Sequence, residues 1–154
     1  MQGAALERFW DSSRCTAQAS AMLARRTGIA RPETAYTFGL FHDCGIPVLI
    51  RRFPDYLDTL QIANGSFDLS FTDVEERRHA THHAAIGTLL TRNWGLPEDV
   101  STAILLHHDL DIFHPDADHT AAHARTLVAL GAGAGTAVVQ VSASIGEAAS
   151  SARV

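Results

Sequence analysis

The stretch Phe38-Gly39-Leu40-Phe41-His42-Asp43-Cys44-Gly45 places an imidazole beside a carboxylate where a predicted helix ends. Pro32 favours the first turn of that helix, and the Gly-Ile-Pro segment that closes with Pro47 is expected to break it. Neutral nitrogen and anionic oxygen are both good ligands for borderline divalent metals, so His42 and Asp43 can point at one cation. The alternative is a surface pair or a helix cap, because a His-Asp dipeptide often arises by chance.

Working outward, apolar periodicity and stop signals divide the chain into helices, and no segment shows the alternation expected of a strand. The sequence predicts an all-α bundle of about six helices, at residues 5–27, 32–43, 54–63, 72–94, 97–108 and 118–130. The fourth begins with the capping-box pattern Thr72-Asp73-Val74-Glu75. Beyond Leu130 the composition changes to Gly and Ala and then to Ser and Ala. We therefore interpret residues 1–130 as one helical domain and 131–154 as a low-complexity, mobile tail.

Glu75, His79 and His83 follow one another at spacings of four in the predicted helix 72–94. Residues four apart lie in a row along one helix face, so these side chains can converge on a common partner. The alternative is a solvated polar stripe, since charged residues stand beside them. His82 points about 100° away from His83 around a helix and is not expected to serve the same site.

His107 and His108 end the predicted fifth helix. Imidazoles there can ligate a metal or, when protonated, complement the negative end of the helix dipole. Other chemistries find little support, because the sequence has no Gly-rich phosphate loop after a strand and no nucleophile-elbow pattern.

The composition narrows the choice of partners and location. The net charge is −5 and no block of basic residues stands apart, which disfavours binding to nucleic acid or to an anionic membrane. Two cysteines are too few for a disulfide framework. The charged N-terminus does not read as a signal peptide, and no apolar run approaches the roughly 20 residues of a membrane span. A cytoplasmic location is expected.

Taken in order, these motifs resemble the HDOD domain, a bacterial branch of the HD metal-dependent phosphohydrolase superfamily. The similarity runs from about Phe9 to Leu130 and depends on the order of the motifs in a helical background. The stretches that carry it are Trp10-Asp11-Ser12-Ser13, Phe38 to Gly45, Glu75 with His83-Ala84-Ala85-Ile86-Gly87, Trp94-Gly95-Leu96-Pro97 and Ala103-Ile104-Leu105-Leu106-His107-His108.

The resemblance implies an HD-like all-α fold with a pocket between helices that is rich in metal ligands. In active relatives such as the HD-GYP phosphodiesterases, similarly placed residues bind two or more metals, which polarise a phosphoryl group and generate a hydroxide nucleophile. The ligands implied in this sequence are His42, Asp43, His83, His107 and His108, with Glu75, His79 and Ser12 as supporting positions.

Three departures from the resemblance argue against catalytic activity, and the first two predict an incomplete metal site. Ser12 stands where the first-helix histidine ligand would be, no carboxylate lies near Leu130-Gly131-Ala132, and the segment after His108 lacks a Gly-Tyr-Pro motif. We therefore expect a signal-transduction domain that is non-catalytic or weakly active. One alternative is a metal-dependent phosphohydrolase of the phosphodiesterase type in which Asp43 helps to orient a metal-bound water. The other is a structural remnant whose histidines are merely packed or solvated.

The cofactor and partners follow from the same comparison. The incomplete cluster could still hold a single zinc, iron, manganese or nickel ion, and spacing does not choose among them. The expected partner is a signalling protein or a small phosphorylated ligand. HDOD domains generally begin with an additional helical lobe that is missing before Trp10, so apolar surface there is expected to be exposed or buried in a homodimer. Without metal, packed imidazoles are expected to have lowered pKa values in at least some of the rings.

Overall fold

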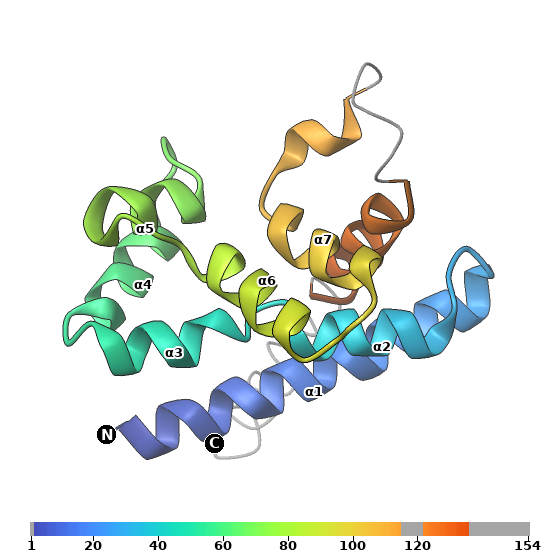
Figure 1. Cartoon of the computed structure of the whole chain (residues 1–154), viewed down its shortest axis with the longest axis horizontal. Coiled ribbons are helices and arrows are strands. Elements are labelled where there is room, and N and C mark those ends of the chain that lie inside the picture. Colours follow the sequence, from blue (N-terminus) through green and yellow to red (C-terminus); the bar gives the residue numbers. More distant parts are fainter. Residues whose placement is uncertain (1, 115–121, 136–154) are drawn as a thin grey trace, which may run out of the picture.

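The computed structural model describes residues 2–114 and 122–135, and every regular element in these ranges is helical (Figure 1). The predicted all-α fold is confirmed. The helices are α1 (Gln2–Thr27), α2 (Pro32–Phe41), α3 (Gly45–Arg52), α4 (Tyr56–Gly65), α5 (Phe71–His79), α6 (His83–Asn93), α7 (Glu98–Leu106), the short 3-10 helix η1 (Leu110–Phe113) and a last helix at 122–135.

The core lies where α1, α2, α7 and the last helix meet. After the turn at Gly28, where φ is 70°, α2 runs back along α1 (Figure 1). Small residues on α1, including Ala24, are fully buried and allow this close approach. Phe38 of α2 packs in one apolar cluster with Ile104 of α7 and Leu127 of the last helix. This packing fixes the C-terminal end of α2, and with it the His-Asp pair, against the rest of the molecule.

The remaining helices are arranged around α6. In Figure 1, α4 and α5 lie at one end of the molecule beyond α3, whereas α7 and the last helix lie on the other side of α6. The end of α2, the start of α6 and the end of α7 consequently come together near the middle of the fold.

The predicted single helix at 72–94 is wrong, because the chain forms α5 and α6 with a break between them. Ala80 ends α5 in the left-handed conformation with φ 54°, and the Nδ1 of His82 accepts a hydrogen bond from the backbone N–H of Ala85 to cap α6. These two caps satisfy backbone groups that an unbroken helix would pair internally. The capping box also differs from the prediction, since it joins Ser70 to Asp73.

The second helix stops before Gly45 and Pro47 as predicted, since α2 ends at Phe41, but these two residues then begin a helix that was not predicted, α3. Proline is tolerated in a first turn because its missing N–H has no intrahelical acceptor there. Gly45 is required by packing, since a Cβ at this position would lie 2.0 Å from the carbonyl oxygen of His83. The glycine thus lets the start of α3 touch the start of α6.

The last helix extends past its predicted end at Leu130 and continues to residue 135. Gly131 lies against the ring of Phe38, and a Cβ there would be 2.5 Å from Cε1 of that ring. The glycine is therefore a packing residue in a helix and not the start of a loop. Residues 118–121 of the predicted helix and 136–154 of the predicted tail lie outside the described ranges.

The surface bears on two predictions. Trp10 is 42% exposed and its ring meets that of Phe9 edge to face, which agrees with the expected apolar surface near this residue. The homodimer built on that surface stays a prediction. Within residues 2–114 and 122–135, no helix combines the length and apolar character that crossing a bilayer requires.

Candidate metal centre

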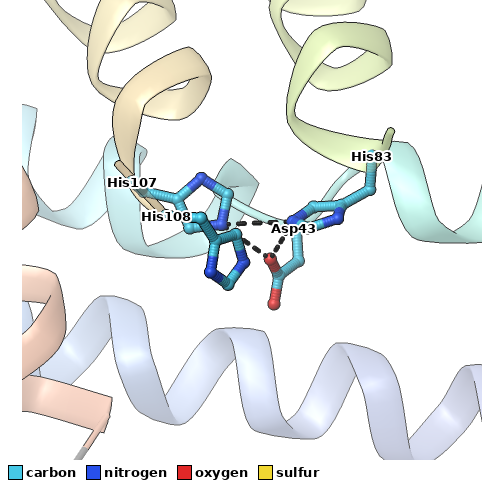
Figure 2. Close-up of side chains that lie close together, drawn as sticks. All are labelled: Asp43, His83, His107 and His108. Carbon is cyan, nitrogen blue, oxygen red and sulfur yellow. Dashed lines mark hydrogen bonds and ion pairs between the residues drawn. The ribbon is translucent and has the colours of Figure 1, made fainter. Parts of the chain in front are cut away.

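Helix ends supply every residue of the histidine cluster. His42 caps the C-terminal end of α2 and Asp43 follows it, His83 is the first residue of α6, and His107 caps α7 with His108 directly after it. Figure 2 shows the side chains of Asp43, His83, His107 and His108 pointing toward one another from these separate elements. All five ligands implied by the sequence resemblance are therefore brought together.

Asp43 lies at the centre of the contacts. Its Oδ1 is 3.2 Å from the Nε2 of His107 and 3.4 Å from the Nε2 of His83, and its Oδ2 is 3.0 Å from the Nε2 of His42. The ring of His108 completes the group, with its centroid 4.2 Å from that of His107. The His83 side chain is fully buried, whereas that of Asp43 is 27% exposed, so access to the cluster is from the carboxylate side.

The opposite nitrogen of three rings is held by a second partner. Nδ1 of His42 donates to the carbonyl of Gly39 at 2.9 Å, and Nδ1 of His107 donates to the carbonyl of Ile104 at 2.7 Å. Nδ1 of His83 donates to Oε2 of Glu75 at 2.7 Å. Because carbonyl and carboxylate oxygens only accept, each ring keeps its hydrogen on Nδ1 and turns Nε2 toward the cluster.

This donor set fits a divalent cation. One ligand atom from each of Asp43, His83, His107 and His108 lies within 4.8 Å of all the others. Donors bound to one cation at about 2.0–2.2 Å stand roughly 3 to 4 Å apart, and the closest contacts of the cluster fall in that range. Second partners on the outer nitrogens are typical of histidines that ligate metals.

Burial and charge divide the imidazoles into two kinds. Burial lowers the pKa of His107, and burial with the neighbouring His107 lowers the pKa of His108 to about 3. Burial would also lower the pKa of His83, but hydrogen bonds to Asp43 and Glu75 raise it to about 9. The lowering expected of packed imidazoles thus holds for two rings only, because carboxylates reverse it in His83.

The pKa of Asp43 is lowered, as it is for a carboxylate in an ion pair. Burial opposes its charge, yet the charge of His42 and hydrogen bonds from His107 and His42 hold its pKa well below the ordinary value. The same carboxylate outweighs burial at His42 and raises the pKa of that ring. Without metal, the imidazoles of the cluster therefore share protons around one anionic group, the carboxylate of Asp43.

A pocket of about 360 Å³ opens onto the cluster. Its walls are mostly apolar, and the ring of Phe71 stacks on that of His108 with centroids 5.3 Å apart. Among the described residues that line it there is no arginine, so the imidazoles supply the only cationic groups. The lining residues outside the cluster are Phe38, Ile46, Asn64, Phe71, Val128, Gly131 and Ala132.

The three supporting positions lie in different places. Glu75 is fully buried behind His83 and contacts its ring. His79 lies away from the cluster, where its Nε2 is 2.8 Å from Oγ1 of Thr59 and its ring packs on Phe53. Ser12 is exposed on α1 and does not line the pocket.

Sequence reasoning did not identify Tyr56 and Phe71 as site residues. Tyr56 is fully buried and its hydroxyl donates to Oε1 of Glu75. Both residues reach the site through the packing of α4 on α5 and of α5 on α6, which no local spacing reveals. The sequence offers no signal for them, because Glu75 stands in a charged stretch beside Glu76, Arg77 and Arg78 and its burial is seen only in the structure.

Comparisons with known proteins agree with this architecture. The family model described as "HDOD domain" matches residues 1–110. An uncharacterized protein of Treponema pallidum is 29% identical over 105 residues, which cover 68% of this chain and 20% of that protein. An HDOD domain protein of unknown function from Geobacter sulfurreducens is 27% identical, with a TM-score of 0.61 over 79% of this chain and 40% of the other.

The response regulator MmoQ of Methylococcus capsulatus is similar to a comparable degree. It is 26% identical, with a TM-score of 0.62 over 82% of this chain and 48% of its own. The chain thus spans less than half the length of each of these relatives.

Proposed function

Because this chain belongs to the HDOD domain family, we propose that it is a signal-transduction domain whose histidine cluster binds one divalent cation with little or no catalytic turnover. The observation that carries the proposal is that the potential metal ligands come from separate helices and meet at one point. Asp43, His83, His107 and His108 converge from three helix ends. Within the described residues, α1 adds no side chain to the pocket, and the last helix adds only Val128, Gly131 and Ala132.

The donor set favours one cation over two. Two-metal hydrolytic centres hold both ions about 3.5 to 4 Å apart and need ligands on each side of the reacting group. Here the helices that flank the pocket present apolar or small side chains in place of further carboxylates. An imidazole-rich set with one carboxylate suits zinc, iron or nickel, and also manganese, better than magnesium or calcium.

The signalling role is supported by the similarity to a response regulator, the MmoQ protein. A signalling protein or a small phosphorylated ligand is the partner we propose, in a cytoplasmic setting. The cation would act as a structural link or as the ligand that is sensed. In either case the affinity for the cation and the conformation of the domain are coupled, since each biases the other.

The experiment that tests this proposal is elemental analysis of tag-free protein by mass spectrometry. The wild type is expected to carry about one transition-metal ion per chain, and His83→Ala with His107→Ala is expected to carry none while staying folded. His123→Ala is the matched control, because His123 is exposed and away from the cluster. Wild-type protein that stays metal-free after incubation with zinc, iron, manganese and nickel would refute the proposal.

A metal-dependent phosphohydrolase is the second candidate, favoured by the pocket of about 360 Å³ beside Asp43. A bound divalent cation would supply polarisation of a phosphoryl oxygen and a water of lowered pKa. Asp43 would accept a hydrogen bond from the attacking water, and the apolar walls would limit bulk water. Hydrolysis of bis-p-nitrophenyl phosphate that is lost in Asp43→Asn would favour this candidate, whereas equal rates in both proteins would exclude it.

A further inference from the structure

A buried chain of hydrogen bonds leads from α4 through α5 to the cluster. The hydroxyl of Tyr56 donates to Oε1 of Glu75, and Oε2 of Glu75 accepts from Nδ1 of His83 at 2.7 Å and from its backbone N–H at 3.3 Å. All three residues are 0% exposed. They come from three different helices, although nothing in their spacing requires them to meet.

Stability alone does not account for this arrangement. Burying a carboxylate costs free energy that hydrogen bonds only partly return, and apolar side chains of similar volume often serve a core equally well. Yet both carboxylate oxygens of Glu75 are occupied by donors, which fixes the plane of the carboxylate. Such complete use of a buried acceptor indicates that its position matters.

The position of His83 in its helix explains the need for Glu75. His42 and His107 are oriented by carbonyls three residues earlier in their own helices, those of Gly39 and Ile104. His83 is the first residue of α6, so no helical carbonyl precedes it. The break between α5 and α6 brings the Glu75 carboxylate to the place that a carbonyl fills in the other two rings.

We propose that Tyr56 and Glu75 are positioning residues that hold the His83 ring with Nε2 toward the cation, so that they set the cation affinity of the centre without touching the cation. This inference rests on the proposed cation site. Tyr56 fixes Glu75, and Glu75 fixes the tautomer and the rotation of His83. Residues of this kind commonly change metal affinity by roughly 10- to 100-fold when they are replaced.

The test is a titration of the 154-residue chain with Co²⁺, followed by its visible absorption. Tyr56→Phe removes only the hydroxyl and is expected to weaken Co²⁺ binding about 10-fold, and Glu75→Gln about 10- to 100-fold. Thr59→Ala is the matched control. Thr59 of α4 is also fully buried, but its hydroxyl is hydrogen bonded to His79 and Arg78 of α5 and takes no part in the hydrogen-bond chain from Tyr56 through Glu75 to His83. It is expected to lower stability but to change Co²⁺ affinity less than about twofold.

The outcomes separate this inference from the proposed function. Unchanged affinity in both Tyr56→Phe and Glu75→Gln, or equal weakening in Thr59→Ala, overturns the positioning role. A wild type that binds no Co²⁺ refutes the cation site, and nitrogen-15 NMR of the metal-free protein, at a pH high enough that the His83 ring is neutral, then tests the hydrogen-bond chain. A hydrogen on Nδ1 of His83 in the wild type, with this preference lost in Glu75→Gln, supports the positioning role, and a hydrogen only on Nε2 overturns it.

Discussion

The Nε2 atoms of His83 and His107 lie 3.2 Å apart, although each ring has its Nδ1 hydrogen bonded elsewhere. Two neutral rings held in this way would face each other with lone pairs. A proton or a metal cation between them relieves the repulsion, and the hydrogen bonds to Asp43 and Glu75 that raise the pKa of His83 favour a proton there in the metal-free protein. Metal and proton therefore compete for one position.

This competition predicts proton release when a cation binds. His83 has a pKa of about 9, so it is protonated near neutral pH, whereas the lowered pKa values of His107 and His108 leave those rings neutral. Binding of Zn²⁺ near pH 7 should therefore release about one proton per ion. Calorimetric titrations in two buffers of different ionisation enthalpy measure this number, and a value near zero would contradict the assignment of His83.

The stability of the metal-free protein should be greatest near pH 6.5. The contribution of His83 is fully present below its unfolded pKa of 6.5 and is lost as the pH rises through about 9. His108, with a folded pKa of about 3, acts in the other direction, so its contribution is present above 6.5 and is lost as the pH falls toward 3.

Urea unfolding with a chelator, from about pH 4 to about pH 10, measures this profile. His108→Phe keeps a ring beside Phe71 and removes the titration, so the acid limb of its profile should be flatter. Stability that rises steadily from pH 6.5 to 9 would be inconsistent with the contacts of His83.

Two neighbouring glycines of the last helix should respond to alanine in opposite ways. At Gly131 a Cβ would lie 2.5 Å from the Phe38 ring, whereas at Gly133 it would lie 3.6 Å from Leu23. Gly131→Ala should destabilise the protein by about 1–3 kcal/mol because the ring must move. Gly133→Ala should stabilise it by about 0.5–1 kcal/mol through lower unfolded-state entropy. Denaturant midpoints compare them, and equal effects would show that the Phe38 contact does not constrain the helix.

The break between α5 and α6 gives a further prediction at Ala80. A left-handed conformation, here φ 54°, costs an ordinary residue roughly 1 kcal/mol that glycine does not incur. Ala80→Gly should therefore raise the unfolding free energy by about 0.5–1 kcal/mol, and Ala80→Val should lower it. If Ala80→Gly is less stable than the wild type, residues 72–94 favour a continuous helix in solution.

The sequence was sufficient to predict the fold class and the cluster, for reasons that particular residues make clear. The periodic apolar positions and the ordered motifs around His42, His83 and His107 are local signals, so most of the helices and the residues that meet in the cluster could be identified. The resemblance, not the spacing, supplied their convergence, because His83 and His107 lie 24 residues apart.

The errors have two physical origins. The helical role of Gly131 depends on the Phe38 ring, which is distant in sequence, whereas the break at Ala80 comes from local caps at Ala80 and His82 that helical periodicity does not reveal. Glu75, His79 and His83 therefore do not form the predicted row, because that row requires one continuous helix. Only Glu75 contacts His83, and it does so across the break, while His79 pairs with Thr59.

The placement of every residue of the cluster at a helix end has a mechanical consequence for the proposed cation site. A cation held by Asp43, His83 and His107 would tie together the ends of α2, α6 and α7, which are otherwise joined only through the chain and the core. The cation would then cross-link these helix ends, and its affinity would depend on their spacing. A partner that shifts α7 relative to α6 by even a fraction of an ångström would lower or raise that affinity, and cation binding would in turn favour the partner that fits the cation-bound spacing.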